Sequence, residues 1–213
     1  MMVYRFGRMK TNLLRKVVQA FLLAAGLILY MYKANSEETK DNDPGRILFD
    51  FNSPENNDRW ITVNDNVMGG RSKGGFSFRK KRLVFAGSTN TNGGGFSSIR
   101  TKPVDMKLGN ADGVIIRYKA DDRTYKFDVR MERSSVAHRA DFNKNNDTRG
   151  WQETVILFKD LTASWRGMRL SGERFALDQD RIQSMGFMIY DKKDGPFKLQ
   201  VDWIKAYTKS PRS

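Results

Sequence analysis

The stretch YKFDVRM, Tyr125 to Met131, alternates large apolar side chains with charged ones. Successive side chains on a β-strand point to opposite faces, so this pattern predicts a strand with one face in a core and the other in water. The stretch FKLQVDW, Phe197 to Trp203, repeats the alternation, which places Trp203 on the apolar face. The dominant period along this part of the chain is therefore that of a strand.

Further short segments carry the same strand signals, and turn-forming sequences such as GSTNTNGGG, KADDR and DKKDGP separate them. They are Ile47 to Phe51, Phe76 to Arg79, Leu83 to Ala86, Phe96 to Arg100, Val114 to Lys119, Thr154 to Phe158 and Gly186 to Tyr190. Only Asp178 to Ser184 reads as a helical turn, one that leads into the next strand. About nine or ten short strands with almost no helical stripe predict an all-β fold, an antiparallel jelly-roll β-sandwich.

The amino terminus has a different composition. Residues 1–33 contain six basic residues and no acid, and residues 17–32 (VVQAFLLAAGLILYMY) are uncharged and mostly apolar. We expect a hydrophobic helix there, reaching roughly 24 Å against the ~30 Å hydrocarbon layer. Three interpretations stay open: an uncleaved signal anchor, a cleaved secretory signal, and a mitochondrial presequence that runs into an anchor. Each predicts a membrane-associated or exported body, on the periplasmic side of a bacterial membrane or at the mitochondrial inner membrane.

The charge pattern divides the rest of the chain. Residues 34–46 (ANSEETKDNDPGR) hold four acids and two bases without apolar periodicity, which predicts a polar linker before a domain over residues 47–207 and a basic tail over 208–213. The formal net charge is +14, but acids are interleaved with the bases throughout the domain. Mixed charge of this kind is typical of a solvated surface, so we do not expect nucleic-acid binding.

Few residues suit catalysis or metal binding. The chain has no cysteine, which excludes disulfides, thiolate metal sites and a cysteine nucleophile, and its single histidine, His138, lies in a polar stretch where a surface position is expected. A zinc or iron site and a cofactor are not expected. The acid pairs at Asp121 and Asp122, Asp178 and Asp180, and Asp191 and Asp194 fit solvated turns better than calcium ligands.

The stretch NDNVMGGRSKGGF, Asn64 to Phe76, surrounds a basic tripeptide with two glycine pairs. It lacks the spacing of a phosphate-binding loop, and a strand follows it. A turn explains more: the Asx residues can bond to their own backbone, and Gly69 and Gly70 can adopt positive φ. The tetrapeptide GGFS recurs at Gly94 to Ser97, where a glycine pair again leads into a strand. The glycines expected to shape the backbone are Gly69, Gly70, Gly94, Gly95, Gly167 and Gly195.

Five motifs in order resemble one family. They are W-x4-D-x2-MGG-x-S (Trp60, Asp65, Met68 to Gly70, Ser72), FAG (Phe85 to Gly87), GGFSSIR (Gly94 to Arg100), RG (Arg166, Gly167) and GPFKL (Gly195 to Leu199). Their order and spacing are similar to those of the complex I intermediate-associated protein 30 family over roughly Ile47 to Tyr207. The resemblance implies a galactose-binding-like jelly roll and a non-catalytic assembly factor, a chaperone that holds subunits or assembly intermediates of the respiratory membrane complex NADH:ubiquinone oxidoreductase.

The site expected from this resemblance is a protein-contact surface at the edge of the sandwich. The partner-binding candidates are Trp60, Asn64, Asp65, Met68, Arg71, Ser72, Trp165 and Arg166. Trp165 stands beside arginine and glycine in SWRGMRL, where an exposed contact and core packing are equally good interpretations. Two other functions stay open: an exported or periplasmic carbohydrate-binding module, and an enzyme, for which the sequence offers no nucleophile and base pair.

Overall fold

The structure is a computed structural model that describes residues 25–28, 45–52, 58–143 and 150–209. The chain divides into two units, residues 1–43 and 44–213. In the first unit only the helical residues 25–28 are described, so most of the hydrophobic helix expected over 17–32 lies outside the described residues. Within the described ranges, no helix has the length and apolar character needed to cross a membrane.

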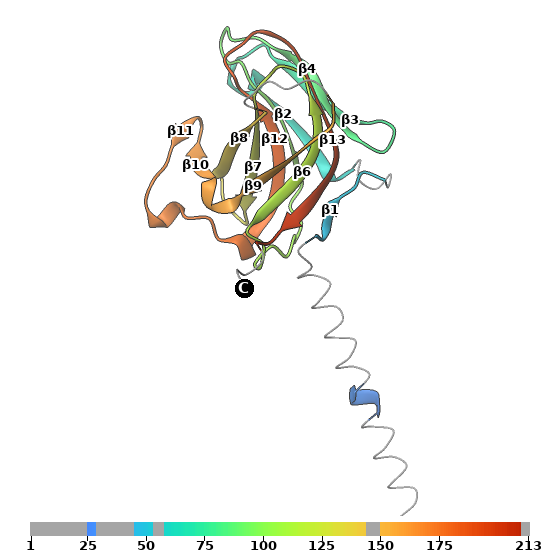
Figure 1. The fold of residues 1–213 in the computed structure, drawn as a ribbon. Helices are drawn as coiled ribbons and strands as arrows, with labels where there is room; N and C mark the ends of the chain where they lie inside the picture. Colours follow the sequence, from blue (N-terminus) through green and yellow to red (C-terminus); the bar gives the residue numbers. More distant parts are fainter. Residues whose placement is uncertain (1–24, 29–44, 53–57, 144–149, 210–213) are drawn as a thin grey trace, which may run out of the picture. The chain divides into compact units, whose positions relative to one another are not determined.

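One antiparallel sheet of the second unit contains six strands (Figure 1). Its order is β3-β4-β13-β6-β9, and β1 also pairs with β13. The strands are β1 (Ile47–Phe49), β3 (Lys73–Phe78), β4 (Leu83–Thr89), β6 (Gly113–Ala120), β9 (Gln152–Leu157) and β13 (Gly195–Tyr207). The long β13 is central because its first half pairs with β4 on one side and its second half with β6 on the other.

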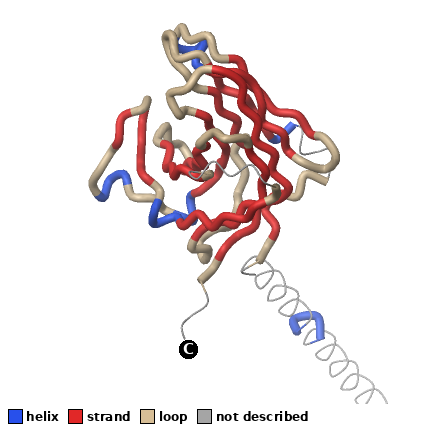
Figure 2. Tube along the Cα trace, turned by 45° about the horizontal axis from the view of Figure 1, so that its top comes forward, coloured by secondary structure: helices blue, strands red, loops and turns tan. Residues whose placement is uncertain are grey.

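The other antiparallel sheet contains seven strands in the order β11-β10-β8-β7-β12-β5-β2. They are β2 (Trp60–Asn64), β5 (Ser97–Thr101), β7 (Tyr125–Met131), β8 (Ala137–Phe142), β10 (Thr162–Trp165), β11 (Met168–Arg169) and β12 (Ile182–Ile189). The β2 and β11 strands are its two edges. Figure 2 shows how far strands dominate this unit, with helix confined to short turns.

The core lies between the inner faces of the two sheets. Aromatic contacts join them directly: the ring centroids of Tyr118 and Phe142 are 5.1 Å apart, and those of Phe49 and Trp60 are 5.7 Å apart. Three inward residues of β7, Tyr125, Phe127 and Val129, are fully buried as the alternation predicts, and Met131 at the end of the strand is half-buried. The antiparallel all-β sandwich expected from the sequence is confirmed.

The strand prediction was incomplete and in one place wrong. Four strands, β2, β8, β10 and β11, were not predicted, because they are short or carry polar residues on their inner face. Trp203 was expected in the core, but the pairing register of β13 shifts between Val201 and Trp203. This irregularity turns Trp203 to a half-buried position, where the Lys205 Nζ lies 4.3 Å from the ring centroid.

Candidate functional site

The glycine-rich loop after β2 begins with one turn of 3-10 helix, η2 (Asp65–Met68). Gly69 ends the turn at φ 86°, in the left-handed region that only glycine adopts at little cost, and its N–H donates to the Asn66 carbonyl. Gly70 was expected at positive φ as well, but it is not among the residues that adopt it. Gly70 is needed for a steric reason instead, because a side chain at this position would collide with the side chain of Asp65.

The Asp65 carboxylate is fully buried and accepts four hydrogen bonds. Oδ1 accepts from the Ser72 N–H at 2.9 Å, and Oδ2 accepts from the Ser72 hydroxyl at 2.6 Å, the Gly95 N–H at 2.7 Å and the Phe96 N–H at 3.3 Å. Burial raises the pKa of Asp65, but these hydrogen bonds outweigh burial and hold the pKa below its ordinary value. The carboxylate thus ties the glycine-rich loop to the loop before β5.

Two glycines make room for this carboxylate. A Cβ on Gly70 would lie 2.3 Å from the Asp65 Cγ, and a Cβ on Gly94 would lie 2.4 Å from its Oδ2. Both distances are far below van der Waals contact, so either position excludes a larger residue while the carboxylate keeps its place. One glycine from each loop, Gly70 and Gly94, therefore lies against the same carboxylate.

The residues expected to contact a partner in this loop fall into two groups. In the first group, Trp60 is 3% exposed and stacks on Phe187. Asn64 accepts a hydrogen bond from the Ser97 hydroxyl and donates one to the Gly74 carbonyl. Asp65 and Ser72 are buried against each other. Their side chains hold the loop in shape. Met68, at 62% exposed, and the exposed Arg71 face solvent. Val67, which sequence reasoning passed over, is also exposed at 69%.

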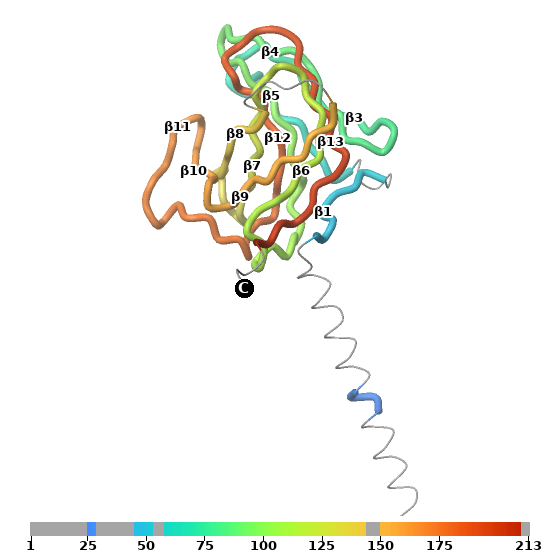
Figure 3. Tube along the Cα trace, viewed as in Figure 1, coloured from blue at the N-terminus to red at the C-terminus, as the bar shows by residue number. Residues whose placement is uncertain are grey.

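Trp165 and Arg166 lie at the other edge of the seven-stranded sheet, on the hairpin formed by β10 and β11 (Figure 3). Arg166 and Gly167 form its two-residue turn, both at positive φ, which is the geometry of a type I′ turn. The Arg166 guanidinium lies 4.9 Å from the Trp165 ring centroid. Trp165 is 39% exposed and its cross-strand partner Met168 is 55% exposed, so the hairpin carries an apolar pair into solvent.

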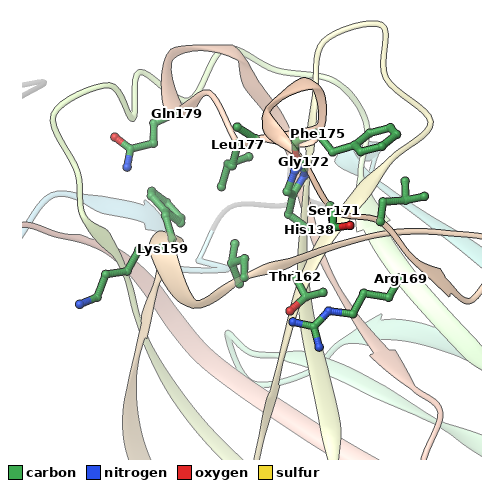
Figure 4. A pocket seen from close by; sticks show the side chains of 14 residues that line it. His138, Lys159, Thr162, Arg169, Ser171, Gly172, Phe175, Leu177 and Gln179 are labelled. Carbon is green, nitrogen blue, oxygen red and sulfur yellow. Dashed lines mark hydrogen bonds between the residues drawn. The ribbon is translucent and has the colours of Figure 1, made fainter.

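Next to this hairpin is a cavity of about 470 Å³ between β8, β10 and the chain over residues 170–179 (Figure 4). Apolar side chains including Phe158, Leu170 and Leu177 line it, and Lys159 and Arg169 add positive charge. Because β11 has only two residues, its alternation was too short to identify Met168 or this cavity from the sequence.

His138 also lines the cavity, and the expectation of a surface histidine was wrong. The residue is 2% exposed because it lies on the inner side of β8, opposite Val129. Its Nε2 is 2.8 Å from the Phe175 carbonyl oxygen, to which it donates in the tautomer that leaves Nδ1 unprotonated. The imidazole thus holds the 170–179 segment against the sheet.

Asp191, one of the acids expected in solvated turns, is instead part of a buried ion pair, whereas Asp194 is exposed as expected. The Asp191 carboxylate accepts from Arg123 Nε at 2.6 Å and Nη2 at 2.7 Å, and both side chains are only 6% exposed. Burial raises the pKa of Asp191, but the hydrogen bonds and charge of Arg123, together with the Lys193 N–H, outweigh burial and hold the pKa below its ordinary value. Within the described ranges, His and acidic side chains form no cluster of three that could hold a metal ion.

Comparisons with known proteins agree with the motifs. The model of the family described as complex I intermediate-associated protein 30 matches residues 49–201. A mouse protein named "Complex I intermediate-associated protein 30, mitochondrial" is 27% identical over 188 residues, which cover 78% of this chain and 57% of the mouse protein. The chain thus spans little more than half the length of that relative.

Among solved structures, a family 11 carbohydrate-binding module from a Clostridium thermocellum cellulase is similar with a TM-score of 0.58 and 14% identity, covering 79% of this chain and 98% of that one. The family 11 module from the same organism in complex with a mixed-linked tetrasaccharide gives 0.53 and 16%, covering 78% and 96%. At these identities the likeness shows a shared jelly-roll fold.

Proposed function

Because the chain belongs to the complex I intermediate-associated protein 30 family, we propose that its sandwich is a non-catalytic binding domain that acts as an assembly factor, a chaperone, for respiratory complex I or a related membrane complex. The observation that carries this proposal is the family match over residues 49–201, nearly the whole sandwich. The name of the mouse relative supports it. The partners are then subunits or assembly intermediates of that complex.

The sandwich suits such a role because it holds exposed contacts on a rigid frame. The glycine-rich loop follows β2 and the Trp165 hairpin contains β11, so the two candidate contacts lie at opposite edges of one sheet. Seven strands at ~4.8 Å spacing place those edges roughly 29 Å apart. Two apolar contacts this far apart suit a broad protein surface better than a small molecule.

The state of the ionisable groups supports binding over catalysis. The His138 imidazole is buried against the Phe175 carbonyl, which leaves it poorly placed as a general base. The Asp65 and Asp191 carboxylates are buried and already accept hydrogen bonds within the fold. A reproducible turnover abolished by His138→Ala would overturn the non-catalytic assignment.

We place the domain at a membrane, either the periplasmic side of a bacterial membrane or the mitochondrial inner membrane. The motivation is the basic, hydrophobic segment over residues 1–33 together with the mitochondrial designation of the mouse relative. Mass spectrometry of the mature amino terminus distinguishes an anchor from a cleaved signal. Recovery of the full chain in a soluble fraction with residue 1 intact would contradict the membrane location.

The assembly role is tested by deleting the gene and resolving membrane complexes on a native gel. We expect mature complex I to fall and a smaller intermediate to accumulate, with recovery when the natural chain is restored. Chains carrying Arg71→Ala or Trp165→Ala should fold but restore less complex. Unchanged amounts of mature complex I in the deletion strain would refute the proposal.

The outer face of the seven-stranded sheet gives the carbohydrate-binding alternative less support than the family match gives the assembly role. Sugars are usually held by stacking on exposed aromatic rings. Among the described residues, the strands of that face turn charged, hydroxyl and small side chains outward, together with the aliphatic Ile61, Val63 and Met188, and no aromatic ring. Titration of the full chain with a glycan panel is the test, and binding at micromolar concentration would favour the alternative.

A further inference from the structure

Three arginines from three strands meet on the outer face of the seven-stranded sheet. Arg100 of β5 pairs with Gly186 of β12, Gly186 pairs with Asp128 of β7, and Asp128 pairs with Arg139 of β8. Directly paired residues share a face, so these four positions form one row across the sheet. Arg130, two residues after Asp128 on β7, adds a third guanidinium to the same face.

This cluster, Arg100, Asp128, Arg130 and Arg139, has one carboxylate for three guanidinium groups. The Asp128 Oδ2 is 3.6 Å from Arg139 Nε and 4.0 Å from Arg130 Nη2, which are ion-pair distances longer than a good hydrogen bond. Arg130 also donates from Nη1 to the Ser135 carbonyl at 2.9 Å. Within the described part of the chain, two of the three positive charges have no matching carboxylate in the cluster.

The arginines are held in place without being fully hydrogen-bonded. The Arg130 and Arg139 side chains are each 20% exposed, and the Nε atoms of both are buried without a hydrogen-bond partner. Burial, and repulsion by Arg100 and Arg139, lower the pKa of Arg130 in spite of Asp128. A second anion over the cluster would relieve that repulsion and supply acceptors for the remaining donors.

The neighbouring positions leave room above the row. Gly186 has no side chain and Ser184 and Ser98 beside it are small, while Met188, 7% exposed, and Ile61, which pairs with Arg100, add apolar side chains to the same face. The result is a basic strip, with aliphatic side chains beside it, that contains the half-buried Arg100, Arg130 and Arg139. A planar guanidinium binds a carboxylate through two parallel hydrogen bonds, so this strip fits carboxylates presented along an extended chain.

We propose that this arginine cluster binds an acidic polypeptide segment, rich in aspartate or glutamate, of the protein that the domain holds. This inference rests on the proposed assembly function and names the chemistry of its partner. An acidic segment is favoured over a nucleic acid because the strands of this face offer no aromatic ring, among the described residues, on which bases could stack.

The test uses the full chain in mild detergent and a fluorescein-labelled hexaglutamate peptide, read by fluorescence anisotropy at low and at physiological salt. Arg100→Gln is the main variant because Arg100 is half-buried and the change leaves Asp128 in place. Lys119→Gln is the matched control: it removes one positive charge from an exposed position of β6, in the other sheet. Arg139→Gln is the second cluster variant.

We expect hexaglutamate to bind the natural chain and each cluster variant to bind about tenfold more weakly, the effect of losing one charged hydrogen bond. Lys119→Gln should change affinity less than about twofold, and Arg100→Lys should retain part of it. Thermal unfolding of each variant checks that the fold is intact. Absence of peptide binding, or equal losses in the cluster variants and the control, would overturn the inference.

Two further probes test whether another negatively charged ligand, a nucleic acid or a simple anion, binds the cluster instead. A ten-nucleotide single-stranded RNA that binds more tightly than hexaglutamate and is released by Arg100→Gln would replace the acidic segment with a nucleic acid. Inorganic phosphate that competes at submillimolar concentration would reduce the site to a simple anion site. Because the native-gel experiment measures the complex itself, the assembly role can hold while peptide binding fails, and the reverse.

Discussion

Replacing Asp65 by asparagine should destabilise the sandwich while leaving its core unchanged. Oδ2 accepts three hydrogen bonds and Oδ1 one, from four donors of two loops. With the amide oxygen at the Oδ2 position, three bonds to a charged acceptor become neutral ones, at a cost of about 1 kcal/mol each. The new NH₂ group then faces the Ser72 N–H, which leaves buried donors unpaired for roughly 1–3 kcal/mol more. Allowing for relaxation, we expect a loss of about 3–5 kcal/mol.

The same carboxylate gives a pH signature. Its pKa is lower in the folded chain than in the unfolded one, because the four hydrogen bonds outweigh the effect of burial. A lowered folded pKa contributes stability that is present above the unfolded value near 3.9 and lost as pH falls through the folded value. Asp65→Asn should therefore remove part of the acid sensitivity below about pH 4, while it lowers stability at pH 7.

Thermal and urea unfolding at pH 7 and pH 3 would measure both effects. For a unit of this size, about 3–5 kcal/mol corresponds to a fall in Tm of at least roughly 6 °C. Asp50→Asn is the matched control, because among the described residues Asp50 accepts hydrogen bonds from Asn52, two residues along the chain, and the change should cost less than ~0.5 kcal/mol. The reasoning is refuted if the two variants unfold at the same temperature at pH 7.

The other predictions use the same unfolding assays or a partner-capture assay. Phe127→Asp places a charge at a fully buried position between the sheets and should cost more than about 4 kcal/mol, so a cooperative transition near the natural Tm would contradict the core assignment. Gly94→Ala brings a Cβ against the Asp65 carboxylate and should lower Tm in the natural chain much more than in the Asp65→Ala background. Asp191→Asn strands the buried Arg123 charge and should cost about 3–5 kcal/mol, and a loss under ~1 kcal/mol would mean that solvent reaches the pair. Arg71→Ala should leave Tm within about 1 °C yet weaken capture of the partner proposed above, since the side chain is exposed, and undiminished capture would limit the loop to turning the chain.

The alternation of YKFDVRM was enough to predict one strand of the core, and β7 has the expected bounds and inward face. Local patterns of this kind work where a strand is long and separates core from water. They fail where the pairing of strands distant in the sequence decides which way a side chain points. The register shift in β13 moved Trp203 out of the core, and the inward position of His138 follows from the pairing of β8 with β7, which no local pattern reveals.

The glycine-rich motifs were partly understood from the sequence. A turn at Gly69 follows from residue type alone, since its φ is 86°. The need for Gly70 and Gly94 was not predictable, because it arises from a carboxylate that reaches both loops only after β2 and β5 have paired. Likewise the arginine cluster unites residues 100 and 139, and only the strand order brings them to one row.

The order of the strands relates the three candidate contacts to one another. The loop with Met68 and Arg71 follows one edge strand, β2, and the Trp165 hairpin contains the other edge strand, β11. The arginine cluster occupies β5, β7 and β8, which lie between those edges. A partner with an acidic segment flanked by apolar surface could bind the arginine cluster through its charges and bury the apolar side chains at both edges of the sheet. Loss of one contact would then weaken capture of the partner without abolishing it.

If the contacts act together in this way, the variant that combines Arg71→Ala, Arg100→Gln and Trp165→Ala should bind the partner more weakly by about the product of the three single fold-changes, because the sites are too far apart to share a contact. A triple variant that binds no more weakly than Arg100→Gln alone would show that the edges bind nothing and that the central strip acts by itself.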